Sequence, residues 1–121
     1  GVALVAVHEP ERLFRRARAA IEEGPAFLSV IAYWKVMVKA MKGTLDVGDP
    51  RQWWGETLDA LGLRPLLYRP EHIAAIYRLP PVHQDPFDRA LIAQAIVKGL
   101  ALVTTGREIA RHACEGLRVI R

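Results

Sequence analysis

The sequence is poor in cysteine, in long apolar runs and in charge of a single sign. Cys114 is the only cysteine among 121 residues, which excludes a disulfide scaffold. No run approaches the ~20 apolar residues that a membrane-spanning helix requires. With 51% hydrophobic residues and a net charge of only +4, the composition is not that of a disordered chain. One domain over residues 1–121, located in the cytoplasm, is therefore predicted.

Several generic site motifs are also missing. There is no glycine-rich phosphate loop, and no two of the four histidines have zinc-ligand spacing on one helix. Cys114 precedes Glu115, which disfavours a thiolate and indicates a small buried hydrophobe. The sequence pI near 9.6 permits an anionic partner such as RNA, and it is equally typical of an ordinary solvated surface.

Capping and turn residues divide the chain into alternating helices and short apolar strands. Asp49-Pro50 and Asp85-Pro86 predict helix starts, and Gly43, Gly62 and Gly99 predict helix ends. The expected helices cover residues 10–23, 31–42, 50–61, 70–77, 86–99 and 107–114, and the expected strands cover 26–30, 63–68, 100–104 and 117–120. This alternation favours a three-layer α/β/α domain with a mainly parallel sheet.

The helix expected over residues 31–42 carries two kinds of side chain at helical spacing. Its apolar residues are Trp34, Met37, Val38 and Met41. Lys35, Lys39 and Lys42 recur at i, i+4 and i+7, and they form either a solvated stripe or a set of contacts to an anion. The pair Trp53-Trp54 is more typical of one core and one lid residue than of a base-stacking platform.

Two carboxylates mark the start of the helix expected after residue 85. Asp85 is placed to cap it and Asp88 lies in its first turn, so both sit at the positive end of the helix dipole. In a parallel α/β sheet, sites form at the carboxyl ends of the strands. A carboxylate there can face a cation or a phosphate-bound metal, whereas the alternative is helix capping alone.

The segment His83–Ala95, which holds both carboxylates, resembles the PIN-domain family, in particular toxin ribonucleases of the VapC type. Leu100–Thr105 resembles the penultimate strand of that family, and Ala32–Lys39 followed by Gly43-Thr44-Leu45 resembles its second helix. Val2–Leu13 resembles the stretch just after the first strand. The resemblance implies a PIN-like fold whose first strand is missing or replaced: either Val2–Val7 substitutes for it, or the sheet rearranges, or a partner chain fills the gap.

The resemblance further implies a magnesium- or manganese-dependent endoribonuclease with three or four metal-binding acids, since Mg²⁺ prefers oxygen ligands. Only Asp88 matches one of those acids; Asp85 is a residual candidate nearby. Lys35 and Gly106 stand where the family has two others, and the acid that closes the first strand is absent. We therefore predict that Lys35 contacts Asp88 in place of a metal ion, and that metal at Asp88 is bound weakly or not at all.

Two functions remain open from the sequence. The first is a toxin-type ribonuclease of a toxin–antitoxin pair that is impaired or inactive. The alternative is a non-catalytic PIN-fold module that binds an antitoxin, itself or RNA, with Lys39, Lys42 and Thr105 as candidate nucleic-acid contacts. In both, the resemblance implies a homodimer formed through the early helices and an antitoxin peptide as partner, with no membrane association.

Overall fold

The computed structural model describes residues 3–5, 18, 22, 24–80, 85–103 and 118–120. Its strands form a five-stranded sheet in the order β3-β2-β1-β4-β5, and every neighbouring pair is parallel. The strands are β1 (Ala3–Val5), β2 (Ala26–Ser29), β3 (Arg64–Leu66), β4 (Ala101–Val103) and β5 (Arg118–Ile120). The chain therefore builds outward from β1 to β3, returns to the other side of β1, and builds outward again to β5.

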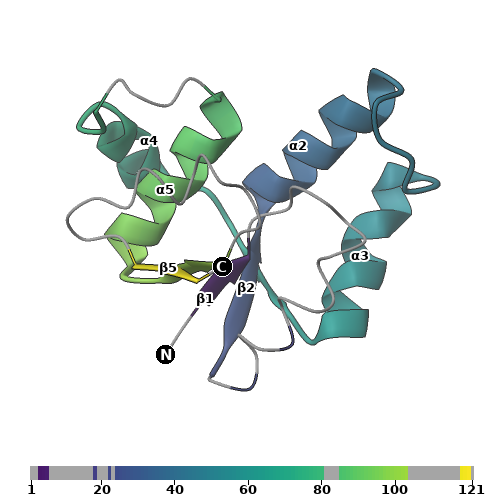
Figure 1. The fold of residues 1–121 in the computed structure, drawn as a ribbon, viewed down its shortest axis with the longest axis horizontal. Coiled ribbons are helices and arrows are strands. Elements are labelled where there is room, and N and C mark those ends of the chain that lie inside the picture. Colours follow the sequence, from purple (N-terminus) through teal and green to yellow (C-terminus); the bar gives the residue numbers. More distant parts are fainter. Residues whose placement is uncertain are drawn as a thin grey trace.

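Helices cover both faces of this sheet (Figure 1). They are α2 (Val30–Met41), α3 (Pro50–Leu61), α4 (Pro70–Ile76) and α5 (Pro86–Lys98). Successive strand residues point to opposite faces, so Val5 packs into the core beneath α2 and α3, while Leu4 packs into the core beneath α5. The expected three-layer α/β fold is confirmed. None of the helices that the structure describes has the length and apolarity to cross a membrane.

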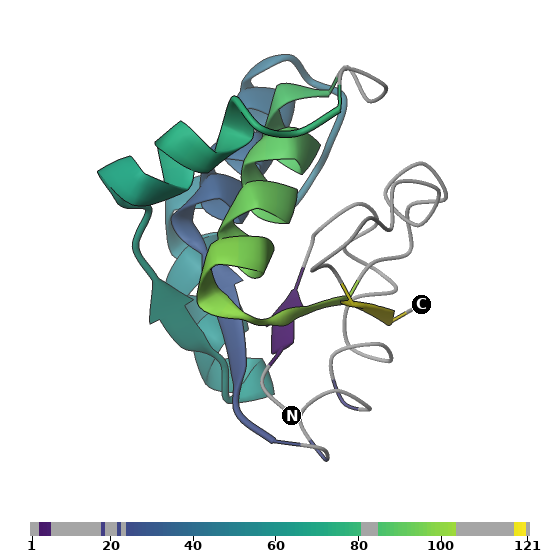
Figure 2. The ribbon, with the colours of Figure 1, turned by 90° about the vertical axis from the view of Figure 1, so that its left-hand side faces the viewer.

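The first strand is the central strand of the sheet, flanked by β2 and β4 (Figure 2). Of the three alternatives for this position, the first one holds, because β1 comes from within Val2–Val7. Leu4 and Val5 are fully buried, as expected for a strand covered on both faces. The expectation that Val2–Leu13 lies just after the first strand is therefore wrong, because Ala3–Val5 is itself the first strand. The apolar side chains of Ala3–Val5 are buried within the domain, so a partner chain is not needed to cover them.

The predicted helix starts and ends are found where the local chemistry placed them. Asp49 and Asp85 cap α3 and α5, each accepting a hydrogen bond from a backbone N–H two residues later. Gly62 and Gly99 end the same helices with φ of +62° and +65°, a conformation that favours glycine. The helices expected over 10–23 and 107–114 lie outside the described residues, apart from Arg18 and Glu22, which are helical.

Polar side chains hold both ends of the short helix α4. At its start, the backbone N–H of Arg69 donates to Nδ1 of the buried His72 across 3.0 Å. At its end, the guanidinium of Arg89 in α5 donates to three carbonyl oxygens, at 2.7, 3.3 and 3.4 Å, those of Pro80, Ile76 and Leu79. These contacts give side-chain partners to the backbone at the start of α4 and in the turn that follows it.

The histidine at the start of α4 makes stability depend on pH. Burial lowers the pKa of His72 below its ordinary 6.5. The folded state therefore holds His72 neutral, and its contribution is complete above pH 6.5 and is lost as the pH falls below that value. We expect the free energy of unfolding in urea to fall by up to about 1.4 kcal/mol per pH unit through this group. In His72→Gln this component should vanish; an identical pH profile in both proteins would contradict the assignment.

Candidate functional site

The order of the strands places a candidate site where the chain changes direction, beside β1 and β4. In open parallel sheets this point, at the carboxyl ends of the strands, is where ligands bind. Helix α2 begins directly at the carboxyl end of β2, with Ser29 as its cap. Helix α5 runs back toward the start of β4, so its first turn lies at the same edge of the sheet. The two helices pack against each other there.

This packing brings Lys35 of α2 and Asp88 of α5 together. The Lys35 Nζ atom lies 3.3 Å from Oδ1 of Asp88, and each side chain is only 4% exposed. The residues are 53 positions apart, so the fold and not local sequence creates the pair. The predicted contact is confirmed. A lysine ammonium can neutralise a buried carboxylate at this distance and supplies a hydrogen bond as well.

The side chains described at this point, one ammonium and one carboxylate, do not by themselves fit a divalent cation. Mg²⁺ and Mn²⁺ need several oxygen ligands, whereas the oxygen of Asp88 faces the ammonium of Lys35. Within the described ranges, no three histidine, cysteine, aspartate or glutamate side chains are grouped so that they could hold a metal ion. The geometry at this point is that of a buried ion pair.

The carboxylate of Asp85 caps the start of α5. Oδ1 of Asp85 accepts hydrogen bonds from the backbone N–H groups of Phe87 and Asp88, at 2.9 and 3.2 Å. That geometry matches the capping alternative considered for Asp85. Thr105 and Gly106, the two candidate positions after β4, lie outside the described residues.

Helix α2 buries a different face from the one its apolar residues suggest. Its buried residues are Ile31, Ala32, Lys35 and Val36. Trp34 and Met41 are 59% and 79% exposed, and the lysines Lys39 and Lys42 are exposed too. The lysine stripe is therefore divided: Lys35 enters the core beside Asp88, while the other two face solvent.

Aromatic contacts extend the apolar surface of α2. Trp34 meets Phe87 edge-on with ring centroids 5.0 Å apart. These two residues directly precede Lys35 and Asp88 in the sequence. Trp54 stacks on Tyr33 at the same centroid distance, while Trp53 is buried. The pair Trp53-Trp54 thus supplies one core residue and one that covers α2, as the sequence favoured.

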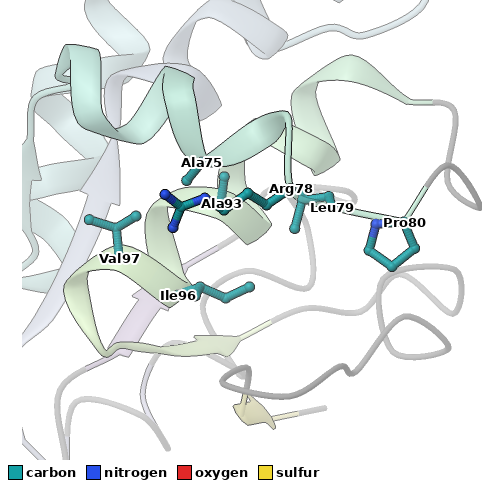
Figure 3. Close-up of a pocket in the computed structure, with 7 residues that line it drawn as sticks. All are labelled: Ala75, Arg78, Leu79, Pro80, Ala93, Ile96 and Val97. Atoms are coloured by element: carbon teal, nitrogen blue, oxygen red, sulfur yellow. The ribbon is translucent and has the colours of Figure 1, made fainter.

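A pocket that the sequence did not indicate lies between α4 and α5 (Figure 3). Its volume is about 400 Å³, and its lining is apolar except for the guanidinium of Arg78, with the other walls formed by Ala75, Leu79, Pro80, Ala93, Ile96 and Val97. Lys35 and Asp88 do not line it. It is separate from the ion-pair site.

Comparison with known proteins identifies the family. A family model of the PIN domain matches residues 2–114 of the chain. The chain belongs to the PIN domain family. The family predicted from the segment His83–Ala95 and the other matching motifs is thereby confirmed. Among curated proteins, no significant match to this chain is found.

Solved structures with this fold include several toxin–antitoxin proteins. VapBC2 of Rickettsia felis, bound to a promoter DNA fragment, is 12% identical with a TM-score of 0.69, covering 99% of this chain and 98% of that one. DNA-bound VapBC of Salmonella typhimurium is 17% identical with a TM-score of 0.66 and the same coverage. A toxin–antitoxin complex of Klebsiella pneumoniae is 22% identical with a TM-score of 0.62, covering 95% and 94%. At these identities the likeness shows a shared fold over the whole length of the PIN chain.

Proposed function

We propose that this chain is a toxin-type PIN protein that acts with an antitoxin polypeptide in the cytoplasm, and that its metal-dependent ribonuclease activity is impaired or lost. The fold supports the first part, because the structural neighbours named above are described as VapBC or toxin–antitoxin assemblies. The observation that carries the second part is the buried Lys35–Asp88 pair. A positive charge at this point opposes the binding of a metal cation and offers no water activation for phosphodiester cleavage.

The alternative function is a non-catalytic PIN module that retains binding only. The exposed ammonium groups of Lys39 and Lys42 on α2 favour weak contact with phosphates, and salt-sensitive RNA binding without cleavage would be its signature. The two functions differ in one measurable property, which is residual metal-dependent cleavage.

Ribonuclease assays with restored acids test the proposal. We expect the purified chain, with Mg²⁺ or Mn²⁺, to cleave a mixed RNA substrate no faster than its Asp88→Asn variant. The double variant Lys35→Glu with Gly106→Asp should gain metal-dependent cleavage, and adding Asp88→Asn to it should abolish that gain. Cleavage by the parent chain that disappears in Asp88→Asn would overturn the impairment.

Self-association is the second partner interaction that we propose. Val30, Trp34, Met37 and Met41 follow one another at intervals of four, three and four residues, which is the seam spacing of packed helices. With Tyr33, the first three of them line a shallow apolar groove. An exposed seam of this kind favours burial against the same helix of a second copy.

Light scattering after size-exclusion chromatography checks the homodimer. We expect a particle of twice the 13.5 kDa chain mass. Trp34→Glu with Met41→Glu should return it to the monomer mass, because two carboxylates would be buried in the seam. Lys42→Glu on the same helix is the control and should leave the dimer intact. A monomer at all concentrations of the parent chain would contradict the dimer.

A further inference from the structure

The pocket between α4 and α5 combines an apolar lining with a single charged side chain (Figure 3). Its volume of about 400 Å³ falls within the roughly 300–1,000 Å³ that small organic ligands occupy in proteins. The two helices contribute small side chains, Ala75 and Ala93, to its walls, which leaves room between them. Leu79, Ile96 and Val97 supply aliphatic surface around this space.

The charged group of the lining is the guanidinium of Arg78, in the turn that follows α4. Figure 3 shows its side chain extending from this turn among the apolar lining residues. Arg78 is exposed, and within the part of the chain that the structure describes its guanidinium has no hydrogen-bond or ion-pair partner. The carbonyl oxygens of Leu79 and Pro80 in the same turn accept from Arg89 instead. The guanidinium of Arg78 is therefore available to an anion in the pocket.

One cation in an apolar lining favours a ligand with one negative charge. The planar fork of a guanidinium matches the two oxygens of a carboxylate. A phosphate monoester carries about −1.5 to −2 charges at pH 7, so Arg78 would leave part of that charge unbalanced beside the apolar walls. The aliphatic lining takes up a hydrocarbon body, because burial of apolar surface needs no directional partner.

We propose that the α4–α5 pocket is a binding site for an aliphatic monocarboxylate. The hydrocarbon part packs against Leu79, Ile96 and Val97, and the carboxylate pairs with Arg78. Because such a ligand contacts both helices, it stabilises the packing of the short helix α4 on the domain. The site does not depend on the proposed function, since neither the buried ion pair nor the apolar groove of α2 belongs to its lining.

Octanoate is the probe, and methyl resonances of the full chain report where it binds. In a titration to millimolar octanoate, we expect saturable shifts of the methyl groups of Leu79, Ile96 and Val97. Hexanoate should bind more weakly, by up to about fourfold for each methylene that it lacks. No shift at these methyl groups, or shifts confined to the exposed face of α2 that carries Met41, would overturn the site.

Probes of the same length with other head groups test the role of Arg78. Octanol and octylamine share the hydrocarbon part of octanoate. We expect octanoate to bind about fivefold more tightly than octanol, and octylamine to bind more weakly than either. Arg78→Gln should remove this preference, whereas Arg64→Gln makes the same change at an exposed residue of β3 and should retain it. Equal Kd values for octanoate and octanol in the parent chain would overturn the proposal.

Ala75→Leu tests whether the space between the helices is needed. Ala75 is half-buried in α4, and leucine is a good helix former, so the domain should fold. The larger side chain fills part of the pocket, and octanoate binding should weaken. Ala74→Leu, at an exposed neighbour outside the lining, is the control and should bind like the parent. Undiminished binding in Ala75→Leu would overturn the site; if this variant does not fold, Arg78→Gln decides by itself.

Discussion

Lys35→Glu should lower the free energy of unfolding by about 3–5 kcal/mol in metal-free buffer, because it removes the ammonium of a buried ion pair. In the variant, two carboxylates would also face each other with little solvent between them. For a chain of this size the melting temperature should fall by roughly 10–20 °C. Thermal unfolding followed by circular dichroism measures the change.

The same variant should respond to metal where the parent chain does not. Two facing carboxylates can share Mg²⁺, and a ligand present at 100 times its Kd raises stability by about 2.7 kcal/mol. We expect millimolar Mg²⁺ to recover much of the lost melting temperature in Lys35→Glu and to leave the parent almost unchanged. Lys39→Glu carries the same charge change on an exposed part of α2 and should move stability by no more than about 0.5 kcal/mol.

Replacing both charged side chains tests whether Lys35 stabilises the fold through its pairing with Asp88 or independently of it. A buried ion pair exchanged for apolar side chains of similar size is often neutral or stabilising. The double variant Lys35→Met with Asp88→Leu should therefore be more stable than either single variant, by a coupling of several kcal/mol. Equal stability of Lys35→Glu and the parent, without a metal response, would show that the two side chains act independently.

The sequence predicted best what neighbouring residues decide. Helix α5 was located from Asp85-Pro86 and Gly99, and both the cap and the positive φ are local properties of those residues. The Lys35–Asp88 contact needed more, because it joins positions 53 residues apart. It was found through the family resemblance, which placed both residues at one edge of the sheet.

Features that depend on the assembled sheet were predicted poorly. Ala3–Val5 is too short a run to indicate a central strand, and it becomes one only through pairing with β2 and β4. Trp34 and Met41 of α2 lie at helical spacing but are exposed, because the helix turns its opposite side toward the sheet. Periodicity in the sequence identifies an apolar face of a helix, whereas tertiary packing determines which face is buried.

Arg89→Ala should lower the free energy of unfolding by about 2–3 kcal/mol, the second large effect that we expect. The arginine belongs to the family segment, yet its spacing gave no hint that it holds the end of α4. Three carbonyl oxygens there accept from its guanidinium, those of Ile76, Leu79 and Pro80. Hydrogen bonds to a charged group contribute about 1.5–3 kcal/mol, and part of the loss is offset because water reaches the exposed Pro80.

Hydrogen exchange should show where this stability is lost. Ile76 and Leu79 are packed against the core beneath α5, so release of their carbonyl groups loosens α4 before the sheet opens. Amide exchange in α4 should accelerate in Arg89→Ala, while exchange in α2 stays unchanged. Arg89→Lys should recover only a fraction of the stability, because one ammonium lacks the planar fork that reaches several carbonyls at once. Arg78→Ala, in the exposed turn after the same helix, is the matched control and should stay within about 0.5 kcal/mol of the parent. Equal stability of the two alanine variants would mean that α4 is held by its apolar contacts alone.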